Sequence, residues 1–190
     1  MDALALDPGD YRGTYKLVGG RLSLDFVNTV SWPDSARRHD WLGSVGNVAL
    51  WLRAVGLAVT DCKPSDLGSI TALRATLTSV LRPLAHGKRP ARDAIDQLNE
   101  YLSVANSRRM IAPVTLAWTW KSPKTALDVF APVLLDTADL LTGDRRDRLR
   151  FCPSCDWLFD DRTRNGQRRW CDMADCGSRD KANRYYHRSK

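Results

Sequence analysis

Apolar residues recur at steps of three and four through most of the first 145 residues, a pattern typical of α-helices that bury one face. The clearest example is the stretch 63–87, whose apolar stripe comprises Ile70, Leu73, Leu77, Val80 and Leu84. We expect Ser65 to cap this helix, Pro83 to disturb its last turn and Gly87 to end it. Further helices are predicted over 45–55, 91–105 and 127–142, with a short helix or a strand-to-helix passage over 21–30.

The period changes to two near the middle of the chain. The alternating apolar residues there are Val114, Leu116, Trp118 and Trp120. Strict alternation is typical of a β-strand with one buried face, so a half-buried strand is predicted. The preceding segment 108–112 is expected to extend this strand or to pair with it. The predicted fold class is therefore mainly α with a small β component.

The charged segment 143–150, "GDRRDRLR", is the natural junction between two parts of the chain. Residues 1–144 are long enough to bury a core and to fold as a helical domain. Residues 145–190 are close to the size below which a chain needs a staple such as a metal ion. We therefore predict two domains, a helical one over 1–144 and a small stapled one over 145–190.

Charge is distributed unevenly between these two parts. The chain has a net charge of +7, but residues 1–144 hold 16 Lys and Arg against 15 Asp and Glu. Residues 145–190 hold 13 Lys and Arg against seven Asp. A basic excess concentrated in one segment indicates a polyanionic partner, although solubility charge is the plainer interpretation of a scattered excess.

Four of the five cysteines fall in this basic segment, as Cys152, Cys155, Cys171 and Cys176. Two residues separate the first pair, four separate the second, and 15 lie between the pairs. Two such pairs supply the four corners of a tetrahedral zinc site, and four thiolates close it, so the zinc should be structural. The alternatives are two disulfides or an iron–sulfur cluster. The fifth thiol, Cys62, is taken as a bystander.

The residues between and after the cysteine pairs predict a treble-clef-like zinc finger. "WLFDD" (157–161) and "RRW" (168–170) are expected to form a hairpin whose tip is Asn165-Gly166, a strong turn signal. A helix should follow Cys176, with Ser178 as its cap and Asp180 in its first turn. Tyr185 and Tyr186 on that helix are expected to cover the metal site or the hairpin.

Basic residues decorate both predicted elements, and we assign them to phosphate contacts. The candidate nucleic-acid-binding residues are Arg162, Arg164, Arg168, Arg169, Arg179, Lys181, Arg184 and Arg188. Lys181, Arg184 and Arg188 are spaced to share one helix face. The alternative for Arg168, Arg169 and Arg179 is local support of the metal centre, whose four thiolates and Zn²⁺ leave a charge of about −2.

The segment from Cys152 to Arg188 resembles the CGNR zinc finger, which lies at the C-terminus of bacterial proteins with an N-terminal ABATE domain. "GGRLSLDFVNTV" (19–30) and "WLRAVGL" (51–57) are similar to the opening of that domain. The signature Cys-Gly-Asn-Arg reads Cys176-Gly177-Ser178-Arg179 here. The resemblance implies a stress-induced transcription regulator whose finger binds DNA, and it leaves open what the Ser at position 178 changes.

Several function classes are disfavoured by the sequence. It has no Gly-rich phosphate loop, nucleophile elbow or helical His-Glu pair, so an enzyme is not expected. It has neither a membrane-spanning apolar run nor a secretory signal, which indicates the cytoplasm. The first hypothesis is a regulator whose helical domain senses a small-molecule effector or forms a homodimer. The alternatives are a protein-interaction module, or an RNA-binding one that stacks bases on Trp157, Phe159, Tyr185 or Tyr186.

Tryptophans bear on the effector question because five of them lie in the first 144 residues. They are Trp32, Trp41, Trp51, Trp118 and Trp120. An aromatic-lined ligand pocket is one interpretation of this set. Core packing is the interpretation we favour for each of them.

Overall fold

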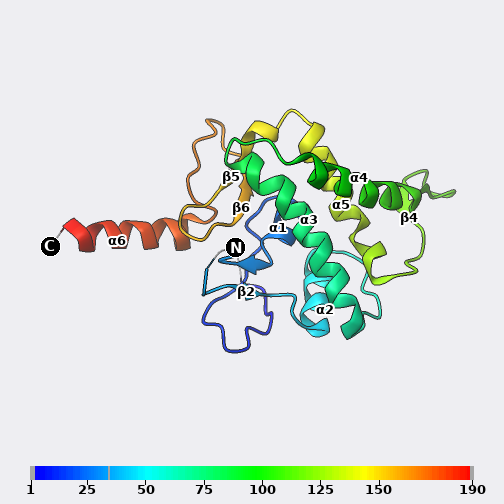
Figure 1. The fold of residues 1–190 in the computed structure, drawn as a ribbon, viewed down its shortest axis with the longest axis horizontal. Coiled ribbons are helices and arrows are strands. Elements are labelled where there is room, and N and C mark those ends of the chain that lie inside the picture. The colour runs from blue at the N-terminus through cyan, green and yellow to red at the C-terminus, as the bar shows by residue number, and fades with distance from the viewer. Residues whose placement is uncertain (1–2, 34, 189–190) are drawn as a thin grey trace.

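The structure is a computed structural model that describes residues 3–33 and 35–188 (Figure 1). Its helices are α1 (Leu22–Val27), α2 (Val45–Ala54), α3 (Leu67–Ala85), α4 (Arg92–Ser107), α5 (Ala131–Thr142) and α6 (Ser178–Arg188). Its strands are β1 (Val30–Ser31), β2 (His39–Asp40), β3 (Arg109–Ile111), β4 (Trp118–Trp120), β5 (Leu149–Phe151) and β6 (Leu158–Asp160). Short 3₁₀ turns lie at Pro64–Asp66, Ala126–Phe130 and Arg146–Arg148, and a π-turn lies at Met173–Gly177.

The strands pair only as three small antiparallel ribbons among the described residues, β1 with β2, β3 with β4 and β5 with β6. The fold is thus mainly α with a small β component, as predicted. We call the described residues from 3 to 144 the helical body and residues 145–188 the finger. Helix α6 projects from one end of the molecule, and the β3–β4 hairpin lies at the opposite end (Figure 1).

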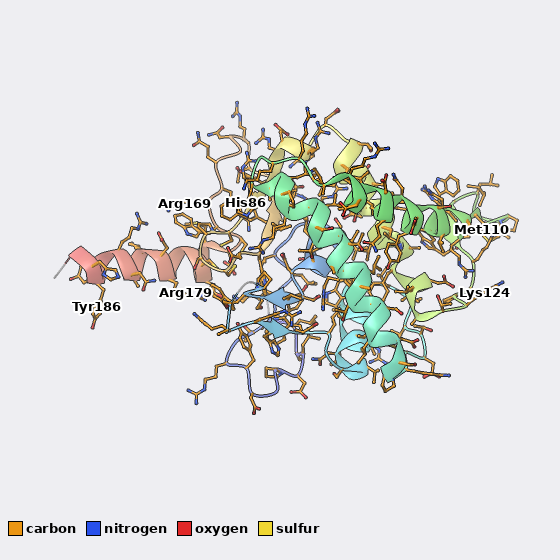
Figure 2. The ribbon with its side chains drawn as sticks, in the orientation of Figure 1. His86, Met110, Lys124, Arg169, Arg179 and Tyr186 are labelled. Atoms are coloured by element: carbon orange, nitrogen blue, oxygen red, sulfur yellow. The ribbon has the colours of Figure 1, made fainter. Side chains whose placement is uncertain are left out.

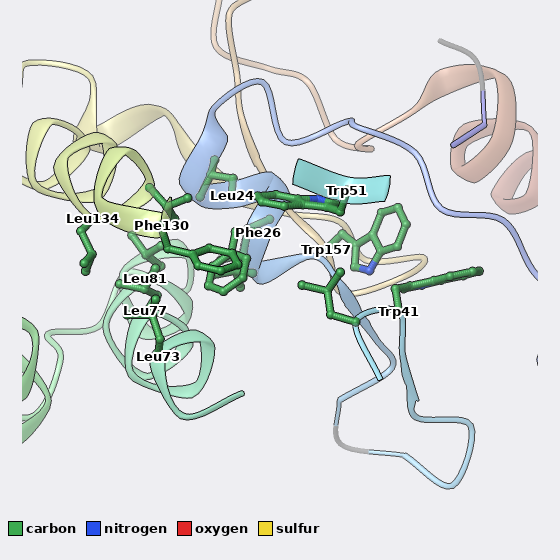
Figure 3. Packing of buried hydrophobic residues seen from close by; sticks show 14 of the residues in the cluster. Leu24, Phe26, Trp41, Trp51, Leu73, Leu77, Leu81, Phe130, Leu134 and Trp157 are labelled. Atoms are coloured by element: carbon green, nitrogen blue, oxygen red, sulfur yellow. The ribbon is translucent and has the colours of Figure 1, made fainter. Parts of the chain in front are cut away.

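The centre of the helical body is aromatic (Figure 3). Phe26 of α1 lies 4.9 Å from Phe130 and 5.5 Å from Trp51 between ring centroids, and all three side chains are fully buried. Leu73 and Leu77 of α3 are fully buried in the same cluster. The apolar stripe predicted for α3 is therefore the face that packs into the core.

The same hydrophobic cluster continues into the finger. Cys152, Trp157, Leu158 and Phe159 are buried members of it, although they lie beyond the predicted boundary at residue 145. The finger thus completes its own small core by resting on the helical body. Division into domains 1–144 and 145–190 stays a prediction.

Helix α3 differs from its prediction at its start and at Pro83, whereas its exit through Gly87 is as predicted. A 3₁₀ turn precedes it, and the side chain of Asp66, rather than that of Ser65, accepts the Lys63 backbone N–H at 2.8 Å. Pro83 removes one intrahelical hydrogen bond, yet the helix runs on through it to Ala85. The chain leaves the helix through Gly87, whose positive φ of 70° suits glycine.

The predicted half-buried strand at 114–120 is wrong in length and in burial. Only β4, Trp118–Trp120, is extended, and it pairs with β3 as expected for the preceding segment. The alternating face meets solvent, with Val114 at 92 % and Leu116 at 77 % exposure. Alternation distinguishes an apolar face of a strand from a polar one, but it does not show whether another part of the protein packs on the apolar face. Trp41 and Trp51 pack in the core as predicted, whereas Trp118 and Trp120 are exposed.

The predicted hairpin over 157–170 is also wrong. Strand β6 pairs with β5, which precedes the first cysteine pair, and no strand forms over 168–170. The reason is Asp161, whose carboxylate accepts the backbone N–H groups of Thr163 at 3.0 Å and Arg168 at 2.8 Å. These bonds hold the intervening residues as a polar loop. Gly166 still forms a turn there, with a φ of 63°.

Helix α6 begins after the π-turn and exposes nearly all its side chains. Asp172 caps the π-turn, because its carboxylate accepts the Ala174 N–H at 2.9 Å, whereas Ser178, the predicted cap, is the first residue of α6. Tyr185 and Tyr186 do not cover the metal site or the hairpin, since they are 76 % and 74 % exposed. None of the helices among residues 3–33 and 35–188 is both long and apolar enough to cross a membrane.

Candidate metal centre and basic surface

The four predicted cysteine ligands converge at the base of the finger. The sulfurs of Cys152, Cys155, Cys171 and Cys176 all lie within 4.8 Å of one another. The Cys155–Cys171 and Cys171–Cys176 sulfur pairs are 3.5 and 3.7 Å apart. A tetrahedron with Zn–S bonds of about 2.3 Å has edges of about 3.8 Å, so the cage matches a single zinc ion.

The chemistry of the cage also favours zinc over the alternatives. All five cysteines are free, and the spacing of 3.5 Å exceeds the roughly 2.05 Å of a disulfide bond. A cage this tight encloses one ion and has no room for a multi-iron cluster. Three of the four sulfurs belong to buried residues and no open coordination position is left, which is the arrangement of a structural site.

Hydrogen bonds among the four sulfurs lower the pKa of Cys152 and Cys176 and oppose ionisation of the other two thiols. Hydrogen bonding with Cys152 raises the pKa of both Cys155 and Cys171. A divalent cation reverses this effect because it stabilises thiolates directly. The cage is therefore expected to gain much of its stability from the metal.

Backbone hydrogen bonds fix the turn that carries the first cysteine pair. The Cys152 N–H donates to the Trp157 carbonyl at 2.8 Å, and the Asp156 N–H donates to the Cys152 carbonyl at 2.8 Å. Asp156 turns the chain with a φ of 61°. This tight knuckle is the connection between β5 and β6, so the hairpin and the metal site form one unit.

The knuckle is docked on the helical body by a side chain that sequence reasoning missed. Asn28 follows α1 and is 1 % exposed. Its amide donates to the Leu158 carbonyl and accepts the Leu158 N–H, both at 2.8 Å. It therefore pairs with β6 as a strand would. The only sequence signal was an Asn between Val27 and Thr29.

Two further contacts hold the finger against the helical body. The Trp157 indole N–H donates to the Val30 carbonyl at 3.2 Å. The Lys16 ammonium lies 3.3 Å from Asp172 and 3.7 Å from Asp175, beside the second cysteine pair. The segments that carry the metal centre are thus held in place by residues more than 100 positions away in the sequence.

Several of the predicted nucleic-acid-binding arginines make local ion pairs. Arg179 contacts Asp175 at 2.7 Å, and Arg184 contacts Asp180 at 3.0 Å, both within one turn. Arg162 contacts Asp160 at 3.1 Å, yet its side chain is 64 % exposed. The pairs at Asp175 and Asp180 lie at the surface and contribute about 0–1 kcal/mol, so a phosphate group can replace these carboxylates at little cost. Asp160 is only 1 % exposed, so its pair with Arg162 is not of this kind.

Arg168 is turned inward instead. Its guanidinium donates to the Trp170 carbonyl at 2.9 Å and to the Cys171 carbonyl, and it lies 4.9 Å from the Phe159 ring centre. These contacts fix the loop that leads into the second cysteine pair. Its geometry favours support of the metal centre.

Other predicted cations face solvent. Arg164, Arg169 and Lys181 are exposed, and no ion pair involves them within the described part of the chain. Arg169 lies on the loop side of the finger and Arg179 near the start of α6 (Figure 2). Arg188 is in the last turn of α6, and its side chain lies outside what the structure describes. The structure thus brings the cations to two neighbouring surfaces, the 161–170 loop and α6.

A helical body joined to a four-cysteine zinc finger defines the class of protein. The family model of ABATE, "putative stress-induced transcription regulator", matches residues 20–144. The chain therefore belongs to the ABATE family, and the CGNR zinc finger model matches residues 148–189. No curated protein matches the chain. The resemblance noted from the sequence is confirmed, zinc fits the four clustered cysteines, and neither family is a type of enzyme.

Proposed function

We propose that the protein is a bacterial transcription regulator whose finger binds duplex DNA. In this proposal residues 145–190 contact DNA and residues 1–144 sense an effector or form a homodimer. The family match supports regulation in general. A cytoplasmic location follows from this role, since the finger needs both DNA and reduced thiols.

The observation that carries the proposal is the projection of α6 from the body (Figure 1). A helix that stands clear of its own protein can approach DNA without a clash, and the major groove admits an α-helix. Lys181 is exposed on this helix, and the Arg184 side chain is 61 % exposed. The neighbouring loop adds Arg164 and Arg169 for contacts with the phosphate backbone.

The test is a salt titration of binding to a labelled pool of genomic duplex fragments. Four phosphate contacts predict that affinity falls roughly 100-fold between 50 and 200 mM salt. The double variant Lys181→Glu/Arg184→Glu should lose most affinity and lower the salt slope by about two, one for each contact. Zinc content should stay unchanged, because neither residue is a predicted ligand.

The matched control is Arg53→Glu, which reverses an exposed charge in the last turn of α2 on the helical body. It should bind duplex as the wild type does. No binding to the pool at low salt would overturn the proposal and favour a protein-interaction module. Preference for single-stranded RNA would favour the RNA-binding alternative instead.

One observation favours protein interaction as a second function. The β3–β4 hairpin exposes Met110, Ile111, Leu116 and Trp118 at the end of the molecule opposite α6. A cluster of exposed apolar side chains often marks an interface. If this hairpin joins two copies, Trp118→Ser should convert a dimer into a monomer in light scattering. A wild-type monomer would remove this second candidate.

A further inference from the structure

A cavity of about 530 Å³ lies between the helical body and the knuckle of the finger. Helix α3 forms one wall, through Ala75, Thr78 and Ser79, and Trp157 and Leu158 of the finger form another. Its volume falls in the range of small-molecule sites, about 300–1,000 Å³. No side chain of the metal cage lines it, so it is distinct from the zinc site.

The cavity has the wall chemistry of a site for an apolar ligand. Val27, Val30, Ala75, Pro83 and Leu158 contribute apolar surface. Thr78 and Ser79 add neutral polar groups. Burial of an apolar body against such a wall is favourable at roughly 25 cal/mol per Å² before the costs of binding.

The charged groups around the cavity are mostly cations. Arg38, Arg82 and Lys88 line it, and Asp156 is the one carboxylate among its described lining residues. Arg38 and Lys88 are exposed, and neither has an ion pair within the described part of the chain. These two residues can therefore turn toward an anionic group without losing a partner.

A buried arginine fixes the floor of the cavity. Arg74 is 2 % exposed, and its guanidinium binds both oxygens of Asp40 and donates to the Thr29 hydroxyl at 2.8 Å. Because its charge is paired with Asp40 and both Nη1 hydrogens are used, Arg74 shapes the cavity without adding net positive charge. Anion selection is left to the exposed cations.

The cavity also joins the body to the metal knuckle. Arg82 of α3 lies 3.7 Å from Asp156, the residue that follows the predicted ligand Cys155. His86, just beyond α3, stacks on Phe151 of β5 with ring centroids 4.0 Å apart. A ligand in the cavity would therefore touch both α3 and the segment that orients Cys155.

We propose that this cavity binds a small organic acid, an apolar molecule that carries one anionic group, and that its occupancy stabilises the docked finger. Arg38 and Lys88 bind the anionic group of the ligand, and the apolar walls bind its apolar part. As the effector of a regulator this ligand rests on the proposed function, but its binding does not require DNA.

The test compares 1-naphthoate with 1-naphthamide by isothermal titration calorimetry on the full zinc-loaded chain. The two probes have nearly the same shape, and only the first is charged. We expect the acid to bind roughly tenfold more tightly than the amide, which corresponds to two charge contacts at a partly exposed site. Equal affinities, or no binding of either probe, would overturn the proposal.

Variants locate the site. Arg38→Gln/Lys88→Gln should remove the preference for the acid and leave the amide affinity unchanged, whereas Arg89→Gln, outside the lining, should change neither. Ala75→Phe should block both probes by filling the cavity. Its matched control is Ala72→Phe on an exposed position of the same helix that is not part of the lining. Binding that survives Ala75→Phe would place the acid elsewhere and contradict the proposal.

The link to the knuckle has its own readout. Chelator-driven zinc release, followed with 4-(2-pyridylazo)resorcinol, should slow in the presence of 1-naphthoate and not in the Ala75→Phe variant. If the acid binds and the release rate does not change, the stabilising role is wrong. None of these measurements involves DNA, so a chain that binds the acid but no duplex would contradict only the proposed function.

Discussion

The helical body and the finger are stabilised by different means. In the body, fully buried side chains such as Phe26, Trp51 and Leu77 meet in one core, and each contributes about 1.5–3 kcal/mol by burial. The finger has only a few buried apolar residues, and it combines them with a four-sulfur cage and docking bonds to the body. The body is therefore organised by its own packing, whereas the finger depends on a metal ion and on its neighbour.

The largest expected effect comes from removing one predicted ligand. Cys171→Ser should abolish stoichiometric zinc binding, since structural zinc sites contribute roughly 10–16 kcal/mol at neutral pH. Zinc per chain, measured by plasma mass spectrometry, should fall from about one to near zero, and the finger should become sensitive to protease. The far-ultraviolet signal of the helical body should persist.

Two matched variants sharpen this difference. Cys62→Ser changes the thiol that lies outside the cage and should leave zinc content at the wild-type level. Leu77→Ala opens a cavity in the body and should cost about 2–5 kcal/mol of unfolding free energy while zinc remains bound. Loss of zinc in Cys62→Ser, or its retention in Cys171→Ser, would mean that the cage is assigned wrongly.

A smaller effect is expected where the two regions meet. Asn28→Ala removes both hydrogen bonds to Leu158 and leaves its backbone groups unpaired in a buried place. We expect a loss of about 2–4 kcal/mol, because each buried unsatisfied group costs about 1–3 kcal/mol. The loosened knuckle should also release zinc faster to a chelator.

The helical body offers a matched asparagine. Asn47 makes the same two-bond contact with the backbone of Asp7, with both distances at 2.9 Å, and it is 5 % exposed. Asn47→Ala should lower stability by a smaller amount, because Asp7 is exposed and water can reach its backbone groups, and it should not change the rate of zinc release. Equal release rates in Asn28→Ala and Asn47→Ala would refute the idea that Asn28 docks the finger.

The same division explains what the sequence could predict. Helices such as α3 could be predicted because the residues that pack into the core recur at helical spacing. The zinc site could be predicted because tetrahedral coordination requires four ligands, which the two cysteine pairs supply. The zinc prediction is confirmed by the family match and the clustered sulfurs. The strand at 114–120 failed since period-two alternation does not reveal whether anything covers the apolar face.

Contacts made by single polar side chains account for the other failures. The hairpin over 157–170 was predicted from the local Asn165-Gly166 signal, yet the loop is held by Asp161 and β6 pairs with β5. The docking role of Asn28 depends on a partner 130 residues away. Such contacts leave no periodic trace, because one polar residue at one position is enough to make them.

The smallest predicted effect separates the two regions by their response to pH. Asp25 in α1 is 8 % exposed, and its carboxylate accepts the Gly19 N–H at 2.8 Å. Burial, with a smaller contribution from Asp136, raises the pKa of Asp25 to about 6, against opposing effects from the Gly19 hydrogen bond and Arg162. The folded body thus holds a proton that the unfolded chain releases near pH 4.

This raised pKa lowers stability as pH increases from about 4 to 6, because the unfolded chain binds fewer protons there, and the loss levels off above pH 6. Asp25→Asn keeps an acceptor for Gly19 and removes the titration. Its unfolding free energy relative to wild type should therefore rise by about 1 kcal/mol between pH 5 and 7, measured by urea titration. Protonation of the zinc thiolates affects both proteins alike, so the difference between them isolates the body. A pH-independent difference would show that Asp25 stays ionised throughout this range, and pH would then no longer distinguish the body from the finger through this residue.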